Sequence, residues 1–259
     1  MQESASPAAE LVAVDSSASS AAATRLWWLP LLAGVLPFAA TLLAFSIAIS
    51  EGRFGACNPL IDGCVSISRA ARYGLANYVF RGLILPAAVL QALVWLLSKP
   101  WLRSIGAPRT HWLRALPPLA LGAAVFLILY GTFLGTEGAW YQWMRRFGVV
   151  FYFGFTCIAM LIVSDAVRRT AAQTLSYRIA SGALLVLCIA LPLLGLINVT
   201  VGLVLSDAAA VDRFENAAEW WGGLIFTTFF LVLAALWRKT SFAAHLRSSP
   251  FDSRKSINL

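Results

Sequence analysis

The chain has 259 residues, of which 59% are hydrophobic and only 12% charged, and its formal net charge is +8. Soluble globular domains carry about 25% charged residues, so this composition excludes an ordinary soluble domain and predicts a membrane protein. The sequence has no basic and aromatic nucleic-acid motif, so we expect no nucleic-acid binding despite the positive charge.

The first 24 residues are rich in Ala and Ser and include Glu3, Glu10 and Asp15. A segment with so few large apolar side chains cannot bury enough surface to fold. We therefore predict a disordered N-terminal tail over residues 1–24. The apolar run after it is too long for a signal-peptide core, which predicts a retained span.

Six apolar runs follow, each long enough to cross a bilayer as a helix. The predicted spans are 26–50, 77–98, 115–134, 147–164, 179–205 and 220–237. These runs lack the alternation of barrel strands, and only helices or closed barrels satisfy their backbone hydrogen bonds within lipid. The predicted fold is all-α, a polytopic six-transmembrane-helix bundle over 25–238 that is followed by a basic tail over 239–259.

Basic residues indicate how the bundle is oriented, because loops rich in Lys and Arg stay in the cytoplasm. Thirteen of the twenty lie on one side of the predicted spans: Arg25, Lys99, Arg103, Arg109, Arg114, Arg168, Arg169, Arg178, Arg238, Lys239, Arg247, Arg254 and Lys255. We therefore expect both termini in the cytoplasm. The net charge then reflects orientation and anionic inner-leaflet lipid.

The first outward loop contains Cys57 and Cys64. An oxidising compartment would permit a disulfide between them, closing a small ring. A metal site is not expected, because His111 and His245 fall on the cytoplasmic side and no Cys-x-x-Cys spacing occurs. The sequence carries no cofactor fingerprint either.

The same loop carries basic residues on the side that they otherwise avoid. Residues 66–73 are expected to form a short interfacial helix, with Arg69 and Arg72 on one face because they are three residues apart. Arg81 follows Asn77 by four residues, about one turn inside the second span. A guanidinium at that depth needs a partner or must snorkel.

Acidic residues at the other outward ends are the candidate partners of these arginines. Glu137 follows the third span, and Asp212, Glu215 and Glu219 precede the sixth. Glu219 stands directly before two tryptophans, which favour the membrane interface. From depth alone we expect a contact between Arg81 and Glu219.

Three interpretations of this polar cluster remain open. In the first, the arginines snorkel to lipid phosphates, the acids pair with them, and the bundle has no site. In the second, Arg69, Arg72 and Arg81 bind a phospholipid or glycolipid headgroup, because guanidinium groups match phosphate geometry. In the third, carboxylates act as acid or base and a serine is the nucleophile. The catalytic candidates are Asp62, Glu215, Glu219, Ser66 and Ser68.

Three stretches resemble the Frag/DRAM/Sfk family of six-span membrane proteins, which includes GPI-anchor remodelling factors and autophagy modulators. They are Cys64 to Leu90 (CVSISRAARYGLANYVFRGLILPAAVL), Arg146 to Ser164 (RFGVVFYFGFTCIAMLIVS) and Ala218 to Trp237 (AEWWGGLIFTTFFLVLAALW). The resemblance implies a membrane protein linked with lipid or glycolipid handling, more an accessory factor than an enzyme. It places Ser66, Ser68, Arg69, Arg81 and Glu219 at signature positions of the family.

We therefore predict an integral membrane accessory protein, in a bacterial inner membrane, that binds an anionic lipid headgroup in an outward pocket. The expected headgroup-binding residues are Ser66, Ser68, Arg69, Arg72, Asn77, Arg81, Glu215 and Glu219. The alternatives are a carboxylate-dependent lipid-remodelling transferase or hydrolase, and a structural partner of another membrane protein.

Overall fold

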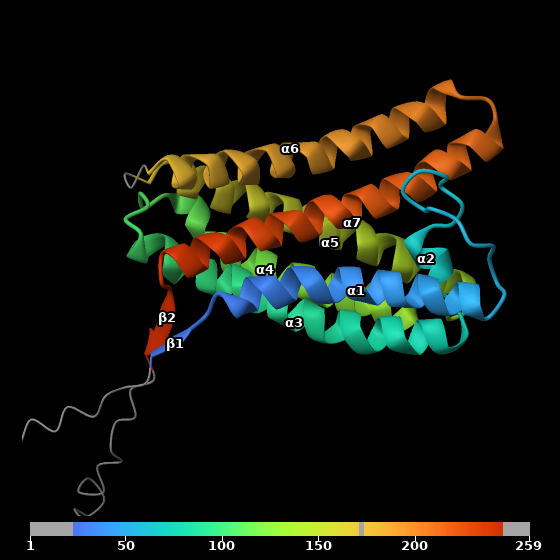
Figure 1. Ribbon diagram of the computed structural model, residues 1–259, viewed down its shortest axis with the longest axis horizontal. Helices are drawn as coiled ribbons and strands as arrows, with labels where there is room; N and C mark the ends of the chain where they lie inside the picture. Colours follow the sequence, from blue (N-terminus) through green and yellow to red (C-terminus); the bar gives the residue numbers. More distant parts are fainter. Residues whose placement is uncertain (1–22, 171–173, 246–259) are drawn as a thin grey trace, which may run out of the picture. The chain divides into compact units, whose positions relative to one another are not determined.

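Six long helices lie side by side in the computed structural model, which describes residues 23–170 and 174–245 (Figure 1). They are α1 (Trp28–Ser50), α3 (Gly74–Ser104), α4 (Leu116–Phe133), α5 (Ala139–Arg168), α6 (Leu175–Val204) and α7 (Ala208–Lys239). In this described part of the chain, these six helices are long and apolar enough to cross a membrane. The protein is therefore a multi-pass membrane protein with the predicted all-α six-helix bundle.

The remaining elements are short. They are α2 (Ile67–Ala70), the 3₁₀ helix η1 (His111–Arg114), and the strands β1 (Ala23–Arg25) and β2 (Ala243–His245), which pair with each other. The predicted tails fall mostly on 1–22 and 246–259, which lie outside the described residues. The helical part, Arg25–Phe242, is one compact unit.

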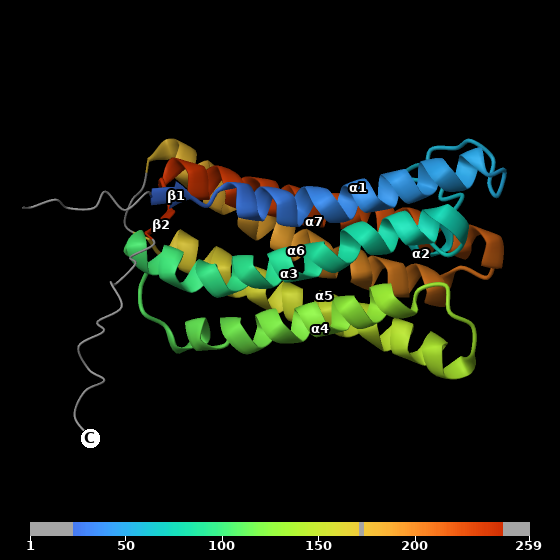
Figure 2. The ribbon, with the colours of Figure 1, turned by 90° about the horizontal axis from the view of Figure 1, so that it is seen from below.

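The helices of the bundle pack in chain order, and α1 also packs against α7, which closes the ring (Figure 2). Close approach depends on small residues, as is usual in membrane bundles. A Cβ added to Gly34 of α1 would lie 2.7 Å from the Cβ of Phe230 in α7. The largest core side chains include Trp95 of α3, whose ring centroid is 5.3 Å from that of Phe230. The bundle therefore has a well-packed core between α1, α3 and α7.

Most of the helices extend beyond the predicted spans, because hydropathy locates the part within hydrocarbon and not the helix ends. Helix α7 begins at Ala208, where the Asp207 carboxylate accepts from the Ala209 N–H at 2.9 Å, twelve positions before the predicted span. Its 32 residues span about 48 Å, against a hydrocarbon thickness of about 30 Å. The first turns of α7 therefore project beyond the apolar part of the helix.

Candidate functional site

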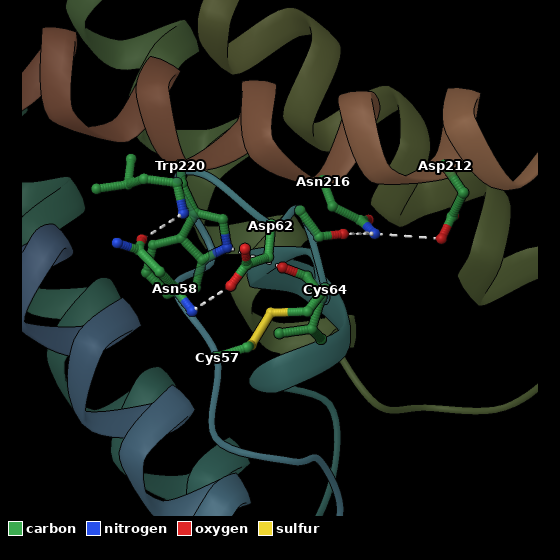
Figure 3. The surroundings of a disulfide bond; sticks show 10 residues. Cys57, Asn58, Asp62, Cys64, Asp212, Asn216 and Trp220 are labelled. Atoms are coloured by element: carbon green, nitrogen blue, oxygen red, sulfur yellow. Dashed lines mark hydrogen bonds between the residues drawn. A yellow bond between two sulfur atoms is a disulfide. The ribbon is translucent and has the colours of Figure 1, made fainter.

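The loop between α1 and α2 is closed on itself by a disulfide between Cys57 and Cys64 (Figure 3). Within this ring, the Asn58 backbone N–H donates to Asp62 Oδ2 at 2.8 Å. The Leu60 N–H donates to Asn58 Oδ1 at 3.1 Å. The disulfide that the sequence permitted is therefore formed, and the ring has a defined internal turn.

Three side chains of α7 hold the loop by donating hydrogen bonds to its backbone carbonyls. The pairs are Asn216 to Gly63 at 2.8 Å, Trp220 to Val65 at 2.9 Å, and Trp221 to Leu60 at 3.0 Å. Asn216 and Trp220 are buried, whereas Trp221 is exposed. Because the buried donors and acceptors satisfy each other, the loop is fixed against α7.

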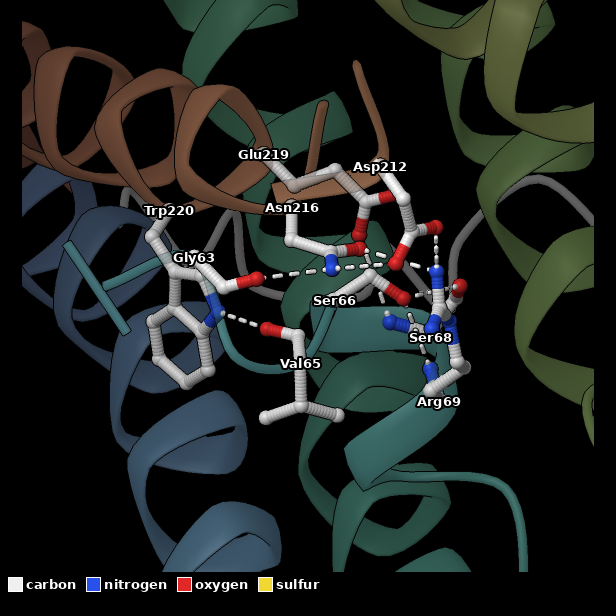
Figure 4. A network of polar contacts seen from close by, with 9 residues as sticks. All are labelled: Gly63, Val65, Ser66, Ser68, Arg69, Asp212, Asn216, Glu219 and Trp220. Atoms are coloured by element: carbon white, nitrogen blue, oxygen red, sulfur yellow. Dashed lines mark hydrogen bonds and ion pairs between the residues drawn. The ribbon is translucent and has the colours of Figure 1, made fainter. Parts of the chain in front are cut away.

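A polar cluster continues this junction into α2 (Figure 4). The Ser66 hydroxyl caps α2 by accepting from the Arg69 backbone N–H at 3.2 Å. The Arg69 guanidinium forms an ion pair with Asp212 and donates to Asn216 Oδ1 at 3.1 Å. The hydrogen bond from Arg69 holds the pKa of the Asp212 carboxyl, in the projecting part of α7, below its usual range.

The two arginines expected on one face of the loop helix have different environments. Helix α2 ends at Ala70, so Arg72 lies beyond it and does not share a helical face with Arg69. Arg69 is turned toward α7, and Arg72 lines a cavity inside the bundle. The prediction of a shared face is wrong because the helix has only four residues.

The cavity has a volume of about 480 Å³ and is lined by α1, α3, α4, α5 and α7. Helix α2 lies at the end of the cavity next to the disulfide loop, which we call its outer end. Its walls are mostly apolar, including Phe38, Phe80, Leu127, Phe153 and Phe226. The charged and amide side chains come from the outer ends of the elements: Arg72, Gln142, Arg145, Arg146 and Glu219. The cavity is therefore amphipathic, with an apolar interior and a polar outer end.

The charges at this outer end are largely unpaired. In the part of the chain that the structure describes, none of Arg72, Arg145, Arg146 and Glu219 belongs to an ion pair. Arg72 Nε is buried with no hydrogen-bond partner among the described residues. With three guanidinium groups and one carboxylate, the outer end carries a positive balance that suits an anion.

Arg145 and Glu219 do have backbone partners. Arg145 Nη1 donates to the carbonyls of Phe133 and Thr136, at 3.1 and 2.6 Å, and so binds the end of α4. Glu219 accepts from the Ser68 N–H at 3.4 Å. Arg72 and Arg146 are therefore the guanidinium groups that remain for a ligand. A second cavity of about 330 Å³ shares Arg72, Gln142 and Arg145 with the first.

Of the predicted site residues, Ser68, Arg72 and Glu219 line the cavity, and Ser66 and Arg69 belong to the adjacent polar cluster. Asn77, Arg81 and Glu215 do not line it.

Asn77 has a structural role instead. Its buried amide donates to the carbonyls of Ala71 and Leu134, at 2.9 and 3.0 Å, and joins the α2 segment to the end of α4. Glu215 is exposed on α7, one turn before Glu219.

The expected contact between Arg81 and Glu219 is wrong. Among the described residues no ion pair joins them, and Glu219 instead contacts α2. The physical reason is angular position, because Phe80 and Ile84 line the cavity from α3, as Glu219 does from α7, whereas Arg81 does not line it. Equal depth in the membrane therefore did not bring the two side chains together.

Tyr130 of α4 also lines the cavity. The sequence did not predict the site residues Asn216, Tyr130, Gln142, Arg145 and Arg146. A signal was present for the arginines, since Arg145 and Arg146 also lie on the side that basic residues avoid. Asn216 lies one turn from both Asp212 and Trp220, which indicates a polar face on an extended helix. Tyr130 of α4 had no such signal, because tyrosine is common in spans near the interface.

No protein-family model matches this chain, and no curated protein or solved structure matches it.

Proposed function

We propose that this protein is an integral membrane accessory protein that binds a lipid by its anionic headgroup. The observation that carries the proposal is the amphipathic cavity, whose mostly apolar walls meet Arg72 and Arg146 at one end. Among the described residues neither arginine belongs to an ion pair, and Arg72 Nε is buried without a hydrogen-bond partner. Guanidinium groups bind phosphate through charge-assisted hydrogen bonds, and lipid chains need a dry apolar surface.

The volume of the cavity supports a lipid chain as its occupant. A volume of about 480 Å³ lies within the range of ligand pockets, about 300–1,000 Å³. The mostly apolar walls suit an acyl chain. A small soluble anion would leave the apolar walls without a partner.

The setting of the cavity supports a site that faces away from the cytoplasm, and we propose that the membrane is a bacterial inner membrane. The disulfide lies in the loop beside the cavity, and disulfides persist in oxidising compartments. The predicted excess of basic residues is on the opposite side. The resemblance to the Frag/DRAM/Sfk family supports lipid binding at this cavity, because Ser68 and Glu219, which the resemblance places at signature positions, line it.

Native mass spectrometry of the detergent-solubilised protein tests the proposal. When phosphatidylglycerol is supplied as a phosphate-bearing probe, the wild type should bind it as a defined adduct. The double variant Arg72→Gln/Arg146→Gln should lose it, with an affinity lower by about tenfold or more, because two charge-assisted contacts are removed. Arg81→Gln is the matched control, since Arg81 is also an outer arginine but does not line the cavity.

Thermal unfolding of each variant shows whether the bundle is intact. Equal lipid binding by the wild type and by a folded Arg72→Gln/Arg146→Gln variant would contradict the proposal. The arginines would then be interfacial anchors.

A further inference from the structure

Glu219 is the feature of the cavity that an anion-binding site does not explain. It is the acidic side chain among the residues that line the larger cavity, and it remains accessible from it. A carboxylate beside a purely anionic headgroup would weaken binding by charge repulsion. The ligand therefore needs a group that favours this carboxylate.

Among the described residues, no ion pair joins Glu219 to a basic side chain. Its carboxylate interacts with the backbone of Ile67 and Ser68, and the Ser68 N–H donates to it at 3.4 Å. The guanidinium of Arg69, on the same segment, is committed to Asp212 and Asn216. In the described part of the chain, one cavity thus presents two arginines and one acid that belong to no ion pair.

We infer that the ligand is a zwitterionic phospholipid with a primary ammonium group, whose phosphate binds Arg72 and Arg146 and whose ammonium binds Glu219. This inference rests on the proposed function and names its ligand class. A headgroup of the phosphoethanolamine type has both charges on adjacent groups, so it matches both signs in one site.

The carboxylate of Glu219 favours a primary ammonium over a quaternary one. A primary ammonium has three N–H donors for carboxylate oxygens, whereas a choline group has none. Aromatic side chains, including Phe38 and Tyr130, also line this cavity, so the preference rests on the N–H donors.

The test compares three phospholipids with identical acyl chains: phosphatidylethanolamine, phosphatidylglycerol and phosphatidylcholine. Each is titrated into the delipidated full-length protein and the adducts are quantified by native mass spectrometry. We expect the wild type to bind phosphatidylethanolamine most tightly. Glu219→Gln should reduce its preference over phosphatidylglycerol by about tenfold, because a charge-assisted hydrogen bond is lost.

Glutamine keeps an oxygen that accepts from the Ser68 N–H, so this variant preserves the contact with α2. The matched control is Glu215→Gln, on the same helix one turn away and outside the cavity. It should keep the wild-type preference.

The outcomes separate this inference from the proposed function. If the wild type binds phosphatidylglycerol or phosphatidylcholine as tightly as phosphatidylethanolamine, or if Glu219→Gln changes no preference, the ammonium site is overturned. The headgroup site still stands in that case if Arg72→Gln/Arg146→Gln weakens binding of phosphatidylglycerol. If the arginine variant binds all three lipids like the wild type, both proposals fail.

Discussion

Asn216 shows how one uncharged residue can organise a charged site. Its buried amide donates to the Gly63 carbonyl at 2.8 Å and to Asp212 at 3.2 Å, and its oxygen accepts from Arg69. Replacing it with alanine leaves a buried carbonyl without a donor. We expect Asn216→Ala to lower the free energy of unfolding by about 1–3 kcal/mol.

Thermal unfolding in detergent checks this expectation, with Glu215→Ala as the control, since Glu215 is exposed on the same helix. The Asn216→Ala variant should unfold at a clearly lower temperature than the Glu215→Ala variant. An Asn216→Ala protein as stable as the control would mean that water replaces the amide and that the junction is loosely held.

Gly63 is a second residue on which the junction depends. It has a φ of +57°, and a Cβ built there would overlap the backbone oxygen of Arg213 in α7. Gly63→Ala should therefore undock the loop, because both the strained φ and the overlap oppose the native arrangement. Limited proteolysis of the loop should become faster.

Gly55, in the same loop, is the matched position, because a Cβ there meets nothing within 4 Å. Gly55→Ala should show the wild-type proteolysis rate. Equal rates for the two alanine variants would contradict the close contact between Gly63 and α7.

The arginines show what the sequence could and could not predict for single residues. Depth in the membrane follows from position along a span, and so an outer polar cluster was predictable. Which way each arginine points depends on where α2 ends and on which helices are neighbours. Arg69, Arg72 and Arg81 therefore looked equivalent in sequence, and only Arg72 lines the cavity.

Among the elements, the disulfide ring and α2 act as one unit over the cavity. Cys64 is two residues before the Ser66 cap, and Ser68 and Arg72 reach the cavity from the same segment. A ring of this size should stabilise the folded loop by about 2–3 kcal/mol. We expect Cys57→Ser/Cys64→Ser to lower both the unfolding temperature and the affinity for phospholipid.

Chemical reduction of the disulfide tests the same contribution of the ring to lipid binding. Dithiothreitol should weaken lipid binding by the wild type, measured by native mass spectrometry, and leave the double serine variant unchanged. Cys157 and Cys188 are free thiols and serve as an internal control, because Cys157→Ala/Cys188→Ala should keep the response to reductant. A wild type whose binding is insensitive to reductant would show that hydrogen bonds from α7 suffice to hold the loop.

The helices themselves were predictable in number but not in length. An apolar run marks the hydrocarbon crossing, which is why each predicted span lies on one helix. The polar first turns of α7 carry no hydropathy signal, although they supply Asp212 and Asn216 to the site. Helix extension beyond the membrane depends on tertiary contacts such as the docked loop, and these are not visible in a local pattern.

For the whole molecule, the six apolar runs were enough to predict a six-helix membrane bundle, because the backbone has few other solutions in lipid. The cavity was not predictable, since side chains from five helices line it and these side chains are far apart in sequence. Arg72, Arg146 and Glu219 come from three different parts of the chain. Their meeting depends on the order of helices around the ring, which hydropathy does not encode.

The orientation of the whole bundle is the last expectation to test. Six crossings place both termini on one side, and the excess of Lys and Arg in the loops of that side predicts that it is cytoplasmic. The disulfide at the opposite end agrees, because a cytosolic loop would be kept reduced. We expect green fluorescent protein fused after Leu259 to fluoresce in a bacterial host, and alkaline phosphatase inserted at Gly135, in the α4–α5 loop, to be active. The reverse pattern would place Arg72, Arg146 and Glu219 on the cytoplasmic leaflet, and the lipid would then have to be sought there.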